Sequence, residues 1–250
     1  MNLASQWLVT FDQKPNASTR VFCFPYAGGS PSIYYPWSRE LDSSIELSVV
    51  QLPGRAQRIK QQPYTHWKPL IVALASAIIY HLDKPFIFFG HSMGGLIAYE
   101  LSRYLQRKGQ PLPQALFISG CAAPLTPSLV PPLGNLPDQT FIEQVDHYYG
   151  AIPPMLLENK ELLQLVLPTL RADFQVCDSY AHTKSTPLSC PIIAMAGTED
   201  QIANQAAVNA WQAFGSDSFE LVMYQGGHFF LNHHHINIIK RIKCVTEHIE

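Results

Sequence analysis

The sequence predicts an α/β fold with one mostly parallel, doubly wound sheet, helices on both of its faces and a helical insertion. Three observations favour this fold. Apolar runs such as Phe86–Phe89 occupy consecutive positions, as in strands that are covered on both faces. Such runs alternate with segments of helical spacing through residues 21–120. The alternation lapses over residues 121–188, where prolines are dense, and resumes at Cys190.

The apolar runs and the segments between them define the expected elements. The runs are short and mostly apolar, and several end at glycine or proline, so we expect strands at residues 21–24, 45–52, 86–89, 115–120, 190–197 and 219–224. The intervening segments place apolar residues on one face, so we expect helices at 32–41, 67–82, 96–109, 138–149, 159–177 and 205–214, and a last helix starting near 233.

Composition limits what this chain does. Its 250 residues suit a single domain spanning 1–250, and 47% hydrophobic with 14% charged residues describes a globular chain. A net charge of -2 gives no reason to expect a nucleic-acid partner. The apolar run at 70–80 is too short to cross a membrane, and residues 1–7 lack the pattern of a secretory signal. We therefore expect a cytoplasmic protein without a membrane partner.

The five cysteines form no C-x-x-C pair, which argues against a zinc site and a disulfide framework. We expect buried thiols and no metal. Three basic residues, Arg55, Arg58 and Lys60, cluster in the loop after the second strand. A solvated loop face is the expected explanation for such a cluster.

The strand at 86–89 leads into a reactive turn. Gly90-His91-Ser92-Met93-Gly94 matches G-x-S-x-G, which places a serine on a tight bend between a strand and a helix. The strand, turn and helix occur here in the required order. A glycine-rich turn whose serine merely caps the helix is the alternative. The context favours Ser92 as a nucleophile, which needs a base from elsewhere in the chain.

Two polar candidates follow later strands. Asp200 comes after the strand at 190–197, and His228 follows the strand at 219–224. Since parallel strands end at one edge of a sheet, we expect Ser92, Asp200 and His228 to meet there in the order nucleophile, acid, base. Glu199 is the alternative acid. His91 is expected to pack away from Ser92.

The other parts of the site are less specific. The loop at 25–30 contains Gly28 and Gly29, so its backbone N–H groups can approach a ligand. One N–H from 26–28 and the Met93 N–H would hold an oxyanion, each contributing about 3 kcal/mol. Residues 121–188 would cover the strand ends as a lid, with a fixed scaffold extension as the alternative. We expect this region, including Met155 and Leu156, to shape the pocket. Adjacent His233, His234 and His235 face different directions on a helix and make a poor metal site.

With these residues located, the chain resembles the type II thioesterases of polyketide and nonribosomal peptide synthesis, which have the α/β-hydrolase fold. The resemblance covers residues 22–231 and rests on FCFPYAGGS, QLPGR, GHSMGG, LPTLRADF, PLSCPI and GGHFFL. It implies that Ser92, Asp200 and His228 are catalytic and that the oxyanion amides belong to Ala27 and Met93.

The resemblance also implies an activity. Such an enzyme hydrolyses acyl thioesters on the phosphopantetheine arm of acyl or peptidyl carrier proteins and clears stalled or wrongly loaded chains. It would act as a monomer, with no cofactor beyond the phosphopantetheine of its substrate. Gly95, Gln201 and residues 150–155 depart from the family pattern, and the last of these puts the acyl-chain preference in doubt. A small-ester hydrolase or acyltransferase, and a non-catalytic hydrolase-like binding module, are the alternatives.

Overall fold

The computed structural model describes residues 6–150 and 152–247. The first five residues of the segment interpreted above as lacking a signal, and Ala151 in the insertion, lie outside the described residues. Seven strands form one sheet in the order β1-β3-β2-β4-β5-β6-β7. They are β1 (Leu8–Val9), β2 (Thr19–Phe24), β3 (Ile45–Val50), β4 (Phe86–His91), β5 (Ala115–Ser119), β6 (Ile192–Gly197) and β7 (Phe219–Tyr224).

The sheet is mostly parallel, as predicted. Strands β2 to β7 pair in parallel, and only the two-residue edge strand β1 pairs antiparallel, with β3. Because β2 to β7 run the same way, the loops that follow β2, β4, β6 and β7 all begin at one edge of the sheet. This edge is where the candidate residues were expected to meet.

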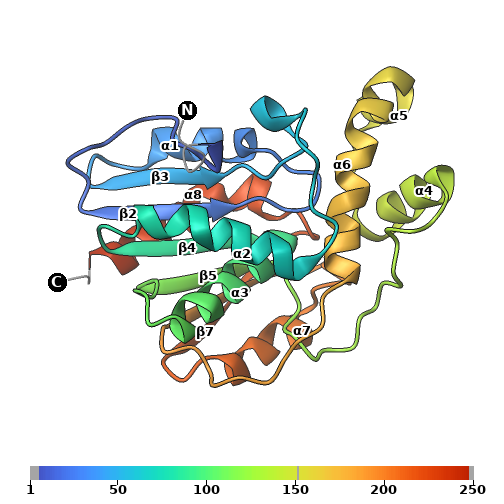
Figure 1. The fold of residues 1–250 in the computed structure, drawn as a ribbon. Coiled ribbons are helices and arrows are strands. Elements are labelled where there is room, and N and C mark those ends of the chain that lie inside the picture. The colour runs from blue at the N-terminus through green and yellow to red at the C-terminus, as the bar shows by residue number, and fades with distance from the viewer. Residues whose placement is uncertain (1–5, 151, 248–250) are drawn as a thin grey trace.

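Helices cover both faces of the sheet (Figure 1). On one face lie α2 (Trp67–Ile78), α3 (Met93–Arg107) and α7 (Gln205–Asn209), and on the other lie α1 (Tyr35–Glu40) and α8 (Leu231–Thr246). Short 3-10 helices, η2 (Pro31–Tyr34), η3 (Ala56–Arg58), η4 (Ile79–His81) and η5 (Ala210–Phe214), complete the connections. None of the helices in the described ranges is long and apolar enough to cross a membrane.

The central strand shows why the sequence specifies two cores. Successive side chains of a strand point to opposite faces. Phe86 and Phe88 of β4 pack into the core beneath α2 and α3, whereas Ile87 and Phe89 pack into the core beneath α1 and α8. All four are buried. An uninterrupted apolar run is what a strand covered on both faces requires.

Residues 121–188 connect β5 to β6. They contain α4 (Asp138–Tyr149), α5 (Pro154–Glu158) and α6 (Lys160–Asp178), which lie beyond the strand ends on the right of Figure 1. This segment has its own apolar cluster, which includes Phe141, Val145 and Phe174. The insertion therefore adds a small core of its own, besides the two cores of the sheet, at the edge where the candidate residues lie.

Candidate active site

Ser92 sits on the turn between β4 and α3 in a backbone conformation that side chains rarely adopt, with φ 53° and ψ −121°. The turn is tight because of its glycines. A Cβ on Gly90 would lie 2.1 Å from the Gly94 carbonyl oxygen, and one on Gly94 would lie 2.0 Å from the Phe24 carbonyl oxygen. Backbone atoms cannot yield at such distances, so G-x-S-x-G is required here by packing.

The edge of the sheet brings the three candidate side chains together. The His228 Nε2 and the Ser92 Oγ are 3.0 Å apart, and the His228 Nδ1 lies 2.8 Å from the Asp200 Oδ2. Ser92 follows β4, Asp200 follows β6 and His228 follows β7. The alternative acid, Glu199, is exposed, whereas Asp200 is buried against the histidine.

Asp200 is held as a carboxylate. Burial alone would raise its pKa, but hydrogen bonding to His228 and to two backbone amides outweighs burial and lowers the pKa below its ordinary value. Its Oδ1 accepts hydrogen bonds from the N–H groups of Ile202 and Ala203, each at 2.9 Å. A carboxylate fixed in this way orients the imidazole and stabilises a positive charge on it.

His91 lies next to His228. It is fully buried, its Nδ1 is 2.9 Å from the Ser119 Oγ, and its ring centroid lies 5.2 Å from that of His228. Burial, followed by the neighbouring His228, lowers its pKa well below the usual value. A neutral His91 ring packs against His228 without competing for its proton, in keeping with the packing role expected for His91.

A cavity of about 150 Å³ opens at Ser92 and His228. Tyr149 of α4 and Phe229 border the imidazole, with ring centroids 5.1 and 5.2 Å from that of His228. Residues of the insertion supply much of the wall: Ser128, Val130, Pro131, Leu133, Tyr149, Phe174, Cys177 and Asp178. The wall is mainly apolar, as an acyl group requires.

The structure does not support the expectation that Met155 and Leu156 shape the cavity. Met155 is 69% exposed, and Leu156 packs against the insertion's own apolar cluster. Among the described residues, neither belongs to the cavity wall. Their α5 lies at the far end of the insertion (Figure 1), whereas Val130 of the same insertion lines the cavity.

The two residues predicted to supply the oxyanion amides, Ala27 and Met93, both line the cavity at Ser92. Met93 is the first residue of α3, and the first N–H groups of a helix have no intrahelical carbonyl partner. Ala27 belongs to the loop after β2 and lines the same cavity as Ser92 and Met93. The structure thus brings both predicted oxyanion residues to the cavity that holds Ser92.

Sequence reasoning misplaced the basic cluster after β3. Only Lys60 is exposed, whereas Arg55 and Arg58 are each 6% exposed. The Arg58 guanidinium donates to the Gln51 carbonyl oxygen and stacks on Trp7, and Arg55 forms an ion pair with Asp173 of α6. The sequence suggested a solvated loop face because the partners that bury the two arginines, Asp173 and Trp7, lie far away in the sequence.

The cysteines match their expected burial only in part. Cys23, Cys121 and Cys190 are buried, Cys177 is half-buried in the cavity wall, and Cys244 is exposed. Burial raises the pKa of the Cys121 thiol to about 12, so this thiol near the site stays protonated and does not act as a nucleophile.

A serine on a strained strand-to-helix turn, hydrogen-bonded to a histidine that is itself bonded to a buried aspartate, defines a serine hydrolase of the α/β-hydrolase fold. Comparison with known proteins makes this more specific. The chain belongs to the thioesterase family, whose model, described as "Thioesterase domain", matches residues 19–245. It is accordingly a hydrolase that acts on thioesters.

Several of its relatives are named for the biosynthesis of particular compounds. The chain is 40% identical over 231 residues to LgrE of Brevibacillus parabrevis, named a linear gramicidin dehydrogenase, covering 91% of this chain and 88% of the relative. It is 38% identical over 227 residues to the gramicidin S biosynthesis protein GrsT of Aneurinibacillus migulanus, with the same coverages. The solved structure of RedJ, a thioesterase of the prodiginine pathway of Streptomyces coelicolor, is 34% identical, with a TM-score of 0.82 and coverage of 92% and 91%.

Proposed function

We propose that this protein is a type II, editing thioesterase that removes acyl groups from the phosphopantetheine arm of acyl or peptidyl carrier proteins of a polyketide or nonribosomal peptide synthetase. The hydrogen-bonded chain from Ser92 through His228 to Asp200, opening into a small apolar cavity, is the observation that carries the proposal. Relatives of similar length named for such pathways support the carrier-bound substrate.

The first half of the reaction acylates the enzyme. The Ser92 Oγ attacks the thioester carbonyl carbon while its proton passes to the His228 Nε2, 3.0 Å away. The oxyanion is held by the N–H groups of Ala27 and Met93. The tetrahedral intermediate collapses, the C–S bond breaks, and the imidazolium returns the proton to the leaving thiolate of phosphopantetheine.

The second half regenerates the serine. Water attacks the acyl ester on Ser92, and His228 now takes the proton of the water. The same amides hold the second oxyanion. The C–O bond to Ser92 then breaks as the His228 imidazolium returns the proton to the Ser92 Oγ, and the free acid leaves. Asp200 keeps the Nδ1 of His228 protonated throughout, so that the Nε2 is free to accept a proton in both halves.

Mass spectrometry of carrier proteins tests the proposal. Carriers loaded with acyl groups of several lengths are incubated with the protein, and the expected product is the unacylated carrier with its phosphopantetheine retained. Ser92→Ala should leave the acyl group in place while the circular dichroism spectrum stays unchanged. Carriers that remain acylated with the wild-type protein would contradict the proposal.

The alternative activities are separated by the substrate. An editing thioesterase should have a higher kcat/KM for acyl-pantetheine than for p-nitrophenyl esters of the same acyl group, whereas a small-ester hydrolase should show the reverse. An acyltransferase would yield an acylated acceptor instead of free acid, and a non-catalytic module would turn over neither substrate.

The name of LgrE raises hydride transfer as a further activity to test. No two glycines of this sequence are separated by a single residue, so it lacks the G-x-G-x-x-G fingerprint of dinucleotide binding. We expect no change in NADH or NADPH absorbance when the acyl carrier is cleared. Oxidation of either nucleotide in step with acyl release would contradict simple hydrolysis.

A further inference from the structure

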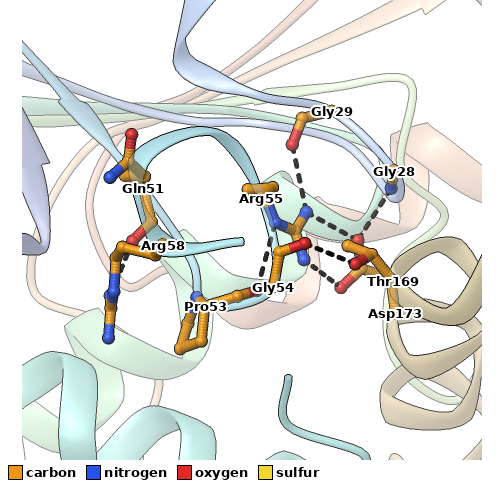
Figure 2. Close-up of polar contacts among 9 residues, drawn as sticks. All are labelled: Gly28, Gly29, Gln51, Pro53, Gly54, Arg55, Arg58, Thr169 and Asp173. Atoms are coloured by element: carbon orange, nitrogen blue, oxygen red, sulfur yellow. Dashed lines mark hydrogen bonds and ion pairs between the residues drawn. The ribbon is translucent and has the colours of Figure 1, made fainter. Parts of the chain in front are cut away.

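A buried ion pair lies behind the loop that carries Ala27. Arg55, in the loop after β3, binds Asp173 of α6 in a bidentate arrangement, with Nη2 to Oδ1 at 2.6 Å and Nη1 to Oδ2 at 2.7 Å (Figure 2). Arg55 is 6% and Asp173 2% exposed. Among the described residues, neither belongs to the wall of the cavity at Ser92.

The ion pair is bonded to the loop after β2. The Asp173 Oδ2 accepts a hydrogen bond from the Gly28 N–H at 2.7 Å, and the Arg55 Nη1 donates to the Gly29 carbonyl oxygen at 3.0 Å (Figure 2). Within the loop, the Gly29 N–H donates to the Tyr26 carbonyl oxygen at 2.9 Å. Three successive peptide groups, from Tyr26 to Gly29, are therefore each fixed by a hydrogen bond.

These bonds determine where the Ala27 N–H points. A peptide group is planar and trans, so its N–H and C=O groups point in opposite directions. The Tyr26 carbonyl is turned inward to accept from Gly29, and the Ala27 N–H of the same peptide must point outward. Gly28 follows with φ 76°, a conformation that favours glycine and that Asp173 holds through the N–H.

We infer that Arg55 and Asp173 are positioning residues for the oxyanion hole: they hold the turn at Tyr26–Gly29 so that the Ala27 N–H is aimed into the cavity at Ser92. The inference rests on the proposed function, since it assumes that Ala27 binds the oxyanion. Because Asp173 lies on α6, this helix of the insertion also helps to position the group that binds the oxyanion.

The charges of the pair favour positioning over stability. Replacing a buried ion pair by apolar residues of similar volume is often neutral for stability, so a need for stability does not by itself explain why two charges are buried here. Hydrogen bonds to a carboxylate are about twice as strong as neutral ones, which suits a group that must keep a peptide from rotating. A second contact, from the Thr169 Oγ1 to the Gly54 carbonyl oxygen at 2.5 Å, ties α6 to the loop that bears Arg55 (Figure 2).

The double variant Arg55→Met with Asp173→Leu tests the inference. It removes both charges together, so no unpaired charge is left buried. Loss of one oxyanion donor lowers kcat by about 10²–10³-fold, and an amide that is misaligned part of the time should cost about 10–100-fold. KM should stay within about twofold, because the ground-state carbonyl depends less on the hole than the transition state.

A transition-state analogue separates positioning from a general loss of structure. A trifluoromethyl ketone adds to the Ser92 Oγ and forms an oxyanion, so its affinity should fall by the same factor as kcat/KM. The matched control is Arg20→Met with Glu46→Leu, a pair at 2.6 Å that joins β2 to β3 near the opposite ends of the same strands. That variant should retain wild-type kcat and inhibitor affinity.

The outcomes are distinct. Wild-type kcat and inhibitor affinity in a folded Arg55→Met/Asp173→Leu variant would overturn the inference and leave the proposed function standing. A wild-type protein that hydrolyses no acyl thioester would overturn the proposed function itself. If the double variant does not fold, Arg55→Lys replaces it as the test. Lysine keeps the positive charge but lacks the planar guanidinium that binds Asp173 and Gly29 together, so we expect a lower kcat with unchanged KM. Unchanged kcat in Arg55→Lys would then overturn the inference.

Discussion

Replacement of the nucleophile by glycine should make the protein more stable than replacement by alanine. Both Ser92→Gly and Ser92→Ala remove the hydroxyl and its bond to His228, so the comparison isolates the backbone. With φ 53° and ψ −121°, residue 92 has the conformation of the first central residue of a type II′ turn, which glycine adopts freely. An alanine there keeps the steric strain of a Cβ.

The size of the difference follows from two opposing terms. A residue held in such a region costs about 1–3 kcal/mol, which glycine relieves. Glycine also gives the unfolded chain more freedom, which costs about 0.4–1 kcal/mol relative to alanine. We therefore expect Ser92→Gly to exceed Ser92→Ala in free energy of unfolding by about 0.5–2 kcal/mol, with a melting temperature a few degrees higher.

Urea denaturation followed by circular dichroism measures this difference. The two variants should share the same slope of free energy against urea and differ in midpoint, because the surface exposed on unfolding is the same. Both should be inactive. Equal midpoints, or a lower midpoint for Ser92→Gly, would show that the turn at residue 92 is not strained.

Three further predictions concern the same site. Gly94→Ala should destabilise the fold by about 3 kcal/mol or more, because the new Cβ would lie 2.0 Å from the Phe24 carbonyl oxygen; a melting temperature within a few degrees of the wild type would contradict this packing. Asp200→Asn should lower kcat by about 10⁴-fold. Because the folded-state pKa of Asp200 is lowered, its charge stabilises the fold above about pH 4 and ceases to do so as the pH falls. The difference in unfolding free energy between wild type and Asp200→Asn should therefore narrow from pH 7 to pH 3. A constant difference would argue against a lowered pKa of Asp200. Val130→Ala should raise kcat/KM for longer acyl groups relative to short ones, whereas Met155→Ala at the exposed α5 should change neither; equal effects of the two variants would exclude control of acyl length by the cavity wall.

The centre of the sheet was predictable because its strands are covered on both faces. Short apolar runs such as Phe86–Phe89 that end at glycine are typical of buried strands, and β4 and β7 occur where they were expected. The edge strand β1 was missed, since two residues carry no alternation. Helix α5 was missed for a similar reason, because five residues are fewer than the window in which helical periodicity is visible.

The meeting of Ser92, Asp200 and His228 was predictable because each follows a parallel strand. Because parallel strands all end at the same edge of the sheet, the three residues lie at that edge regardless of the lengths of the connecting segments. The support of the oxyanion loop was not predictable from spacing. Arg55 and Asp173 are 118 residues apart, and nothing in either local sequence indicates that a loop cation would be buried by an acid on a helix of the insertion.

The residues that line the cavity were likewise not predictable from the sequence. A proline-rich insertion between β5 and β6 was evident in the sequence. The packing of α4 and α6 around Phe141 and Phe174, however, determines which of its residues reach the cavity at Ser92. Helical periodicity identifies an apolar face without identifying its partner. The expectation for Met155 failed at this step.

Trapping the covalent intermediate tests the central claim most directly. The protein is mixed with an acyl-pantetheine, quenched in acid within the first turnovers, digested and mapped by mass spectrometry. We predict that the peptide containing Ser92 gains the mass of the acyl group, and that this adduct disappears as free acid accumulates. Rapid hydrolysis with no adduct on that peptide, together with undiminished turnover in Ser92→Ala, would contradict the account.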